Sequence, residues 1–132
     1  MNSRLPLLLV GVAALSSAAD AQPQGRFDLA CVGKQTGTRG TEDFKQVLHV
    51  DLKRRIYCWD TCTIWLPIRK IEANRITFRD KSAKHPWAKD LAWWEIRSGK
   101  YEGHVMFSAR AFIEIKTEAV CRMARFSADT KS

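Results

Sequence analysis

The feature that most constrains the fold of this chain is a set of short runs in which apolar and polar residues alternate. In one run Phe27, Leu29 and Cys31 share a face, and in another Ile76 and Phe78 do so. This period of two is typical of half-buried β-strands, and turn residues separate the runs. No stretch of a dozen residues keeps the apolar stripe of a helix. The pattern predicts an all-β fold: a small antiparallel up-and-down meander that closes into a β-barrel or a highly curved sheet.

The first residues follow the three-part plan of a secretory signal peptide. Arg4 supplies a positive charge, Leu5 to Leu15 is uncharged and mostly apolar, and Ala19-Asp20-Ala21 fits the small-x-small rule for cleavage. The apolar stretch is shorter than the roughly 20 residues of a membrane-spanning helix, and no later stretch approaches that length. We therefore expect a signal peptide over residues 1–21, cleavage after Ala21, and a periplasmic or secreted mature protein without a transmembrane segment.

The mature chain has the length of one domain of ordinary size. Residues 22–26 contain Pro23 and Gly25 and no large apolar residue, so we expect a flexible lead-in. Residues 27–126 contain all the predicted strands, show no internal repeat and are expected to form a single β-barrel-like domain. Residues 127–132 form a polar tail.

Four cysteines in an exported chain predict disulfide bonds, because the periplasm is oxidising. Cys58 and Cys62 would lie ~13 Å apart along one strand, whereas a disulfide needs ~7 Å, so their pairing requires a turn between them. Cys31 and Cys121 lie in the first and last predicted strands, which are neighbours in a closed meander, and a bridge there would contribute ~4 kcal/mol. Four cysteines allow three pairings, and zinc or redox chemistry is the weaker alternative because the ligand and C-x-x-C spacings are absent. We predict no metal site.

No catalytic motif is evident. The three histidines are His49, His85 and His104, and nothing places both a carboxylate and a nucleophile beside any one of them. His49 and His104 occupy outward positions of alternating strands. A nucleophile elbow, a phosphate-binding loop, a dinucleotide fingerprint and a zinc-protease motif are all absent. We therefore expect a non-enzymatic binding or accessory protein without a cofactor or catalytic residues. A hydrolase of the cell envelope that uses one of the histidines is an alternative.

Five tryptophans in so short a chain are candidates for ligand binding. Trp93 and Trp94 are adjacent in one strand, so they face opposite sides of the sheet, and one of them can fill the barrel. Trp59, Trp65 and Trp87 lie in or beside predicted loops. These residues either cap the core or form an aromatic rim around a sugar, a glycan strand or an apolar molecule.

The formal net charge is +8, and the Lys and Arg residues are spread along the chain. A surface of this charge attracts polyanions. In a periplasm these are lipopolysaccharide, anionic lipid and wall polymers, and nucleic acid is not an expected partner. The candidate partners are therefore anionic envelope components, a periplasmic protein or a small ligand.

A longer pattern runs through most of the mature chain. Its parts are Phe27-Asp28-Leu29-x-Cys31-x-Gly33, Asp51-Leu52, Tyr57-Cys58-x-x-x-Cys62, Ile76-x-Phe78-x-Asp80, Trp94-x-Ile96-x-x-x-Gly99-x-Tyr101 and Cys121. In this pattern the chain resembles a group of small uncharacterised exported proteins of Gram-negative bacteria. The resemblance implies a fold and a compartment, and it implies no activity.

The chain is also loosely similar to the periplasmic inhibitors of C-type lysozyme. Those proteins are small β-barrels with a first-strand cysteine bridged to one near the C-terminus, and a Ser-Gly-x-x-Tyr loop enters the lysozyme cleft. Cys31 and Cys121 match that bridge, and Ser98-Gly99-Lys100-Tyr101 resembles the loop, with the tyrosine one residue earlier. This resemblance implies that Ser98, Lys100 and Tyr101 contact a partner, and it makes lysozyme inhibition an alternative function.

Overall fold

The computed structural model describes residues 24–82, 88–108 and 110–128, so the predicted signal peptide and Trp87 lie outside the described part. Within that part, nine strands form one antiparallel sheet. The strands are β1 (Arg26–Gly37), β2 (Gly40–Asp51), β3 (Ile56–Trp59), β4 (Leu66–Pro67), β5 (Lys70–Ile71), β6 (Arg75–Ser82), β7 (Lys89–Glu95), β8 (Lys100–Ser108) and β9 (Phe112–Ala124).

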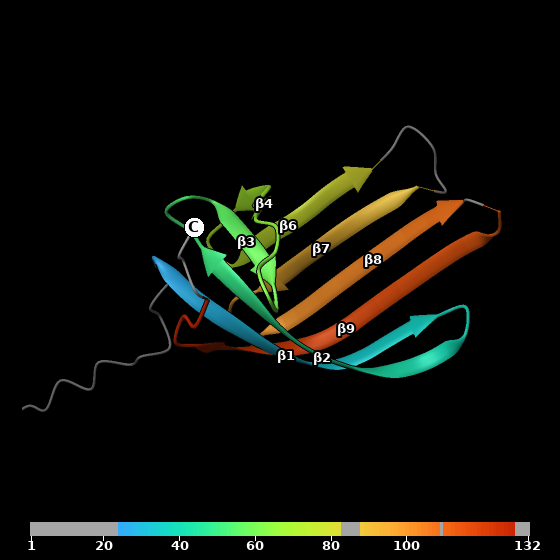
Figure 1. Ribbon diagram of the computed structural model, residues 1–132, viewed down its shortest axis with the longest axis horizontal. Helices are drawn as coiled ribbons and strands as arrows, with labels where there is room; N and C mark the ends of the chain where they lie inside the picture. Colours follow the sequence, from blue (N-terminus) through green and yellow to red (C-terminus); the bar gives the residue numbers. More distant parts are fainter. Residues whose placement is uncertain (1–23, 83–87, 109, 129–132) are drawn as a thin grey trace, which may run out of the picture.

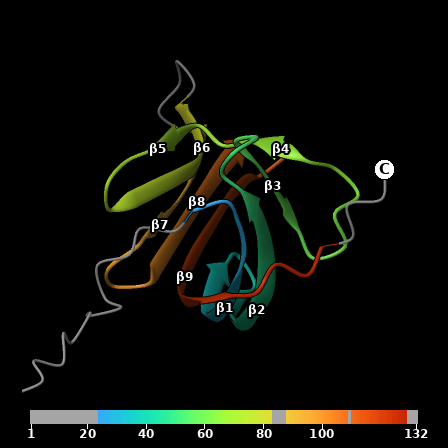
Figure 2. The ribbon, with the colours of Figure 1, turned by 90° about the vertical axis from the view of Figure 1, so that its left-hand side faces the viewer.

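The sheet is an antiparallel meander curled into a half-barrel, which confirms the all-β prediction and selects the highly curved sheet (Figures 1 and 2). Its order is β4-β3-β2-β1-β9-β8-β7-β6-β5, so the first and last strands of the chain pair in the middle. The two edge strands, β4 and β5, follow each other in sequence. Between them, the Ile68 N–H donates to the Arg55 carbonyl and the Arg69 N–H to the Thr77 carbonyl, each at 2.9 Å. The segment from β4 to β5 therefore bridges the two sides of the half-barrel.

Both predicted disulfides are present. Cys31 and Cys121 are directly opposite each other in the β1–β9 pair, with their Cα atoms 4.0 Å apart. They are separated by 90 positions in the sequence. Cys58 and Cys62 are joined around the predicted turn, where Asp60 and Cys62 have positive φ angles of 44° and 53°. The long bridge therefore joins the first and last strands, as their predicted adjacency requires.

The core fills one end of the half-barrel. Strand register places one row of inward residues across it, which we call the core row: Ile76, Trp94, Tyr101, Ala119, Gly33 and Phe44. Around this row, Tyr57 of β3 packs on Phe78 of β6 with ring centroids 4.9 Å apart. Phe44 stacks on Tyr101 at 6.2 Å. These aromatic contacts join strands from opposite sides of the curled sheet, and all these side chains are buried.

Gly33 lies where the backbone of β1 passes close to that of β9. A Cβ atom added there would lie 2.0 Å from the Glu118 carbonyl oxygen and 2.8 Å from the Ala119 Cβ. Real Cβ contacts are not this short, so any side chain would force the two strands apart.

We therefore predict that Gly33→Ala destabilises the protein by about 2 kcal/mol, the usual cost of overpacking a tight site. Gly37→Ala is the matched control, because an added Cβ there meets nothing closer than 3.8 Å and its φ is not positive. We expect that control to be neutral or slightly stabilising, since alanine restricts the unfolded chain. Urea unfolding of both variants measures the difference, and equal stabilities would contradict the packing argument.

Candidate functional site

Beyond the core row, the concave face of the sheet continues as a shallower surface. The next inward row contains the small residues Ala92, Gly103 and Thr117, which are buried. The row after it contains Asp90, Val105 and Ile115, which are half-buried, and the last contains Phe107 and Ile113. We call this surface, together with Arg79 and Lys81 of β6, the trough. Its floor is apolar on β8 and β9 and charged on β6 and β7.

A β-bulge turns Arg79 into the trough. Thr77 pairs with Trp93 and Arg79 with Ala92, so Phe78 is an extra residue in β6. Phe78 and Arg79 therefore both take the inward side, where strict alternation would have placed Arg79 outside. The Arg79 Nε lies 3.2 Å from the Asp90 Oδ1, and both side chains are about one-third exposed. Arg79 is thus held at the charged edge of the trough.

The trough contains two hollows. The first, of about 170 Å³, lies between β3–β4 and β6–β7, and we call it the seam pocket. Its lining is Tyr57, Leu66, Pro67, Arg69, Phe78, Arg79, Lys81 and Asp90. The second, of about 190 Å³, lies beside the β1–β2 hairpin and includes Gln35, Arg39, Glu42, Ile113 and Ile115. The seam pocket has an aromatic and aliphatic floor, with three cations and one carboxylate around it.

The electrostatics at the seam pocket follow from burial and from these charges. Burial raises the pKa of Tyr101 to about 12, and the nearby Arg79 guanidinium opposes the rise. Burial also raises the pKa of Tyr57, while Arg79 and Arg69 act to lower it and Asp90 to raise it. The positive field of Arg79 therefore reaches both tyrosines, and that of Arg69 reaches Tyr57 at the pocket floor.

The chain has two tyrosines, so the absorbance change of tyrosine ionisation reports on Tyr57 and Tyr101 alone. The pKa of Tyr101 in the folded protein lies above the value of about 10 in an unfolded chain. The resulting stability is complete below about pH 10 and is lost as the pH rises towards 12. We predict that absorbance at the tyrosinate band stays low at about pH 10.5 while the protein is folded. Ionisation of both tyrosines at pH 10 without unfolding would contradict this prediction, and Tyr101→Phe should reduce the alkaline loss of stability.

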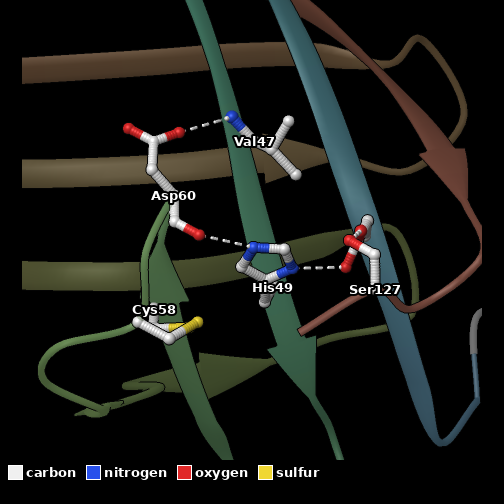
Figure 3. Close-up of a disulfide and its surroundings, with 7 residues drawn as sticks. Val47, His49, Cys58, Asp60 and Ser127 are labelled. Atoms are coloured by element: carbon white, nitrogen blue, oxygen red, sulfur yellow. Dashed lines mark hydrogen bonds and ion pairs between the residues drawn. A yellow bond between two sulfur atoms is a disulfide. The ribbon is translucent and has the colours of Figure 1, made fainter. Parts of the chain in front are cut away.

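On the opposite, convex face, a polar cluster lies beneath the Cys58–Cys62 loop and the C-terminal segment (Figure 3). Asp28 and His49 are only 4% and 5% exposed. The His49 Nδ1 lies 2.6 Å from the Asp28 Oδ1, and its Nε2 lies 2.9 Å from the Asp60 carbonyl oxygen. The Ser127 hydroxyl donates to the other oxygen of Asp28, and the Phe126 ring meets the His49 ring edge-on. His49 therefore occupies an outward phase, as predicted, but is covered.

This cluster has the residue types of a hydrolase triad and a different geometry. In a triad the serine hydroxyl is hydrogen-bonded to the imidazole, which then accepts its proton. Here the Ser127 hydroxyl is bonded to the Asp28 carboxylate, and both ring nitrogens of His49 already have other partners. The arrangement does not activate Ser127. Its effect is to hold the disulfide loop and the C-terminal segment against β1 and β2.

We predict that His49→Ala lowers the free energy of unfolding by about 3 kcal/mol, because it leaves the buried Asp28 carboxylate without its ring partner. His104→Ala is the control. His104 pairs with Glu114 at 2.9 Å, but both side chains are more than a fifth exposed, so its loss should cost less than about 1 kcal/mol. Chemical denaturation measures both values. A cost for His49→Ala no larger than that for His104→Ala would show that the buried cluster adds little.

The structure separates the predicted tryptophans. Trp94 is buried in the core, where its Nε1 donates to the Gly99 carbonyl at 3.2 Å. Trp93 faces outward, and the Arg75 guanidinium carbon lies 5.2 Å from the centroid of its ring. Trp59 is half-buried and edge-on to Phe44 and Tyr101. Trp65 is half-buried in the connection between β3 and β4. None of these four described tryptophans lines either hollow of the trough.

The residues of the predicted partner loop also diverge. Tyr101 is 2% exposed and belongs to the core. The Ser98 Oγ accepts a hydrogen bond from the Lys100 N–H at 3.2 Å. Gly99 has a φ of 74°; its N–H donates to the Glu95 carbonyl, and its carbonyl accepts from the Cys121 N–H. Lys100 lies on the convex face, beside a hollow of about 280 Å³ that also includes Val32 and Val120. The loop is therefore folded back onto β9, and its tyrosine is inaccessible.

Sequence reasoning missed the trough. Val105 and Phe107 lie two residues apart and so share one face of β8, which was a usable signal, although the intervening Met106 is also apolar and obscures the alternation. No comparable signal marks Arg79, because the bulge that turns it inward depends on pairing with β7. The contribution of Arg69 depends on the path of the segment between β4 and β5.

Comparison of the chain with protein-family models, with curated proteins and with solved structures gives no match. Across the described ranges, no helix has the length and apolar character needed to cross a membrane. Within the same residues, no group of three or more His, Cys, Asp or Glu side chains is placed to hold a metal ion.

Proposed function

We propose that this protein is a non-enzymatic binding protein of the periplasm or cell exterior, and that its ligand lies in the trough. The observation that carries the proposal is the change in packing along the concave face. The core row is filled by aromatic side chains, whereas the rows beyond it contain small residues and then half-buried Val105 and Ile115. A concave apolar surface beside a few charged groups is the usual form of a small-molecule site.

The predicted signal peptide and the two disulfides support an extracytoplasmic location. Both cysteine pairs are joined, and no described cysteine is free. Bridges of this kind persist in oxidising compartments and are rare in the cytosol. In that setting, the net charge of +8 favours attachment to anionic components of the cell envelope.

The alternative functions have less support. Lysozyme inhibition would need an accessible tyrosine, and Tyr101 is in the core. A net charge of +8 also repels a cationic lysozyme. Envelope hydrolysis would need an activated nucleophile, and the Ser127 hydroxyl is bonded to a carboxylate.

We predict that the neutral, apolar fluorophore phenylnaphthylamine binds the protein saturably with one equivalent per chain. Val105→Ser should weaken this binding about tenfold, because it removes apolar contact area from the trough floor. Val120→Ser is the matched control: it removes the same side chain from the convex face, where Val120 is 54% exposed, and should leave binding unchanged. A fluorescence titration measures all three affinities.

Circular dichroism and thermal unfolding establish that each variant is folded before binding is compared. Absence of saturable binding to the wild-type protein would count against a ligand in the trough. Equal weakening by the two substitutions would place the apolar site elsewhere.

A further inference from the structure

We infer that the ligand of the trough is an anionic amphiphile: an acyl or alkyl chain that ends in a phosphate or carboxylate, with its head group in the seam pocket. This inference rests on the proposed function and specifies the chemistry that the site recognises. It is carried by the separation of charge and apolar surface within the trough, and by the excess of cations at one side of it.

The head-group end is defined by Arg69, Arg79 and Lys81. One carboxylate, Asp90, faces the same pocket, so the lining side chains have an excess of two positive charges. Asp90 contacts the Nε of Arg79, and a guanidinium has four further N–H groups on its terminal nitrogens. These fork-shaped donors match the paired oxygens of a phosphate or carboxylate. Arg69 and Lys81 are exposed and can turn towards the same anion.

The pocket floor makes this charge more effective. Tyr57 and Phe78 are each 1% exposed and form an aromatic base below the three cations. Charges interact more strongly over such a low-dielectric surface than in open water. The same burial raises the pKa of Tyr57. The same positive side chains would repel a cationic head group.

The strand register shows where the alkyl chain of the ligand would lie. Lys81 is paired with Asp90, Asp90 with Val105, and Val105 with Ile115, so one inward row leads from the charged side onto the apolar floor. Three strand spacings make this path ~14 Å long, and Phe107 and Ile113 extend it by ~7 Å along β8 and β9. Phe107 is 41% exposed, so apolar surface remains open at the far end. The path suits a medium-length alkyl chain.

The test is displacement of phenylnaphthylamine by decyl phosphate, decanoate and neutral decanol, each kept below its aggregation concentration. We expect both anions to bind at least tenfold more tightly than decanol. The double variant Arg69→Gln/Lys81→Gln should bring their affinities close to that of decanol and leave decanol unchanged. The control Lys45→Gln/Arg122→Gln also removes two positive charges, but from exposed positions on the convex face, and should alter all affinities by less than twofold.

Two further arms separate the amphiphile from its parts. Inorganic phosphate alone should not displace the fluorophore, and octyl phosphate should bind up to about fifteenfold more weakly than decyl phosphate, because two buried methylenes are lost. Displacement by inorganic phosphate as effective as by decyl phosphate would overturn the inference in favour of a simple anion site. Affinities that do not depend on chain length would overturn it as well.

The outcomes also distinguish this inference from the proposed function. If decanol and decyl phosphate bind equally, and Val105→Ser weakens both, the trough is an apolar site and the anionic head group is refuted. If neither the fluorophore nor any alkyl compound binds, the proposed function fails and the inference fails with it. Equal loss of anion binding in both double variants would show a general effect of net charge, and would overturn the role of the seam pocket.

Discussion

The pairing of β1 with β9 is the contact on which the rest of the structure depends. It joins the first strand of the sheet to the last, and nine residue pairs from Asp28–Ala124 to Thr36–Lys116 maintain its register. The Cys31–Cys121 bridge lies within that register, and Gly33 permits the close approach beside it. Because the chain ends meet in the centre of the sheet, its open edges fall in mid-sequence, at β4 and β5. We call the open boundary between these two edges the seam. Its location is therefore a consequence of this one pairing.

The seam determines where the half-barrel is open. A fully closed barrel would pair β3 with β6 and cover Tyr57 and Phe78 with continuous backbone. Instead, β4 and β5 have only two residues each, and the segment between them crosses from one side to the other. The core at this end stays buried through aromatic packing, while charged side chains of β6 and β7 surround the remaining opening. The protein can therefore keep its core buried and still have an open pocket at the seam.

Much of the fold could be predicted from sequence, because alternation and cysteine spacing are local or depend on simple topology. The opposite faces of Trp93 and Trp94 and the adjacency of Cys31 and Cys121 follow from those rules alone. The candidate site could not be predicted in the same way. Arg79 enters it through a bulge, against the alternating pattern, and His49 is buried by segments distant from it in sequence. Such features depend on partners that a local pattern does not identify.

The two faces of β2 and β3 link the convex cluster to the trough. On the convex side His49 is hydrogen-bonded to Asp60 in the disulfide loop that follows β3. The Val47 N–H also donates to the Asp60 side chain at 3.2 Å, which holds this loop to β2. On the concave side of the same short strand, Tyr57 forms part of the seam pocket. Because β3 has four residues and its other neighbour is the two-residue β4, β2 and this loop are its main supports. The buried Asp28–His49 pair therefore helps to hold β3, whose opposite face forms part of the seam pocket.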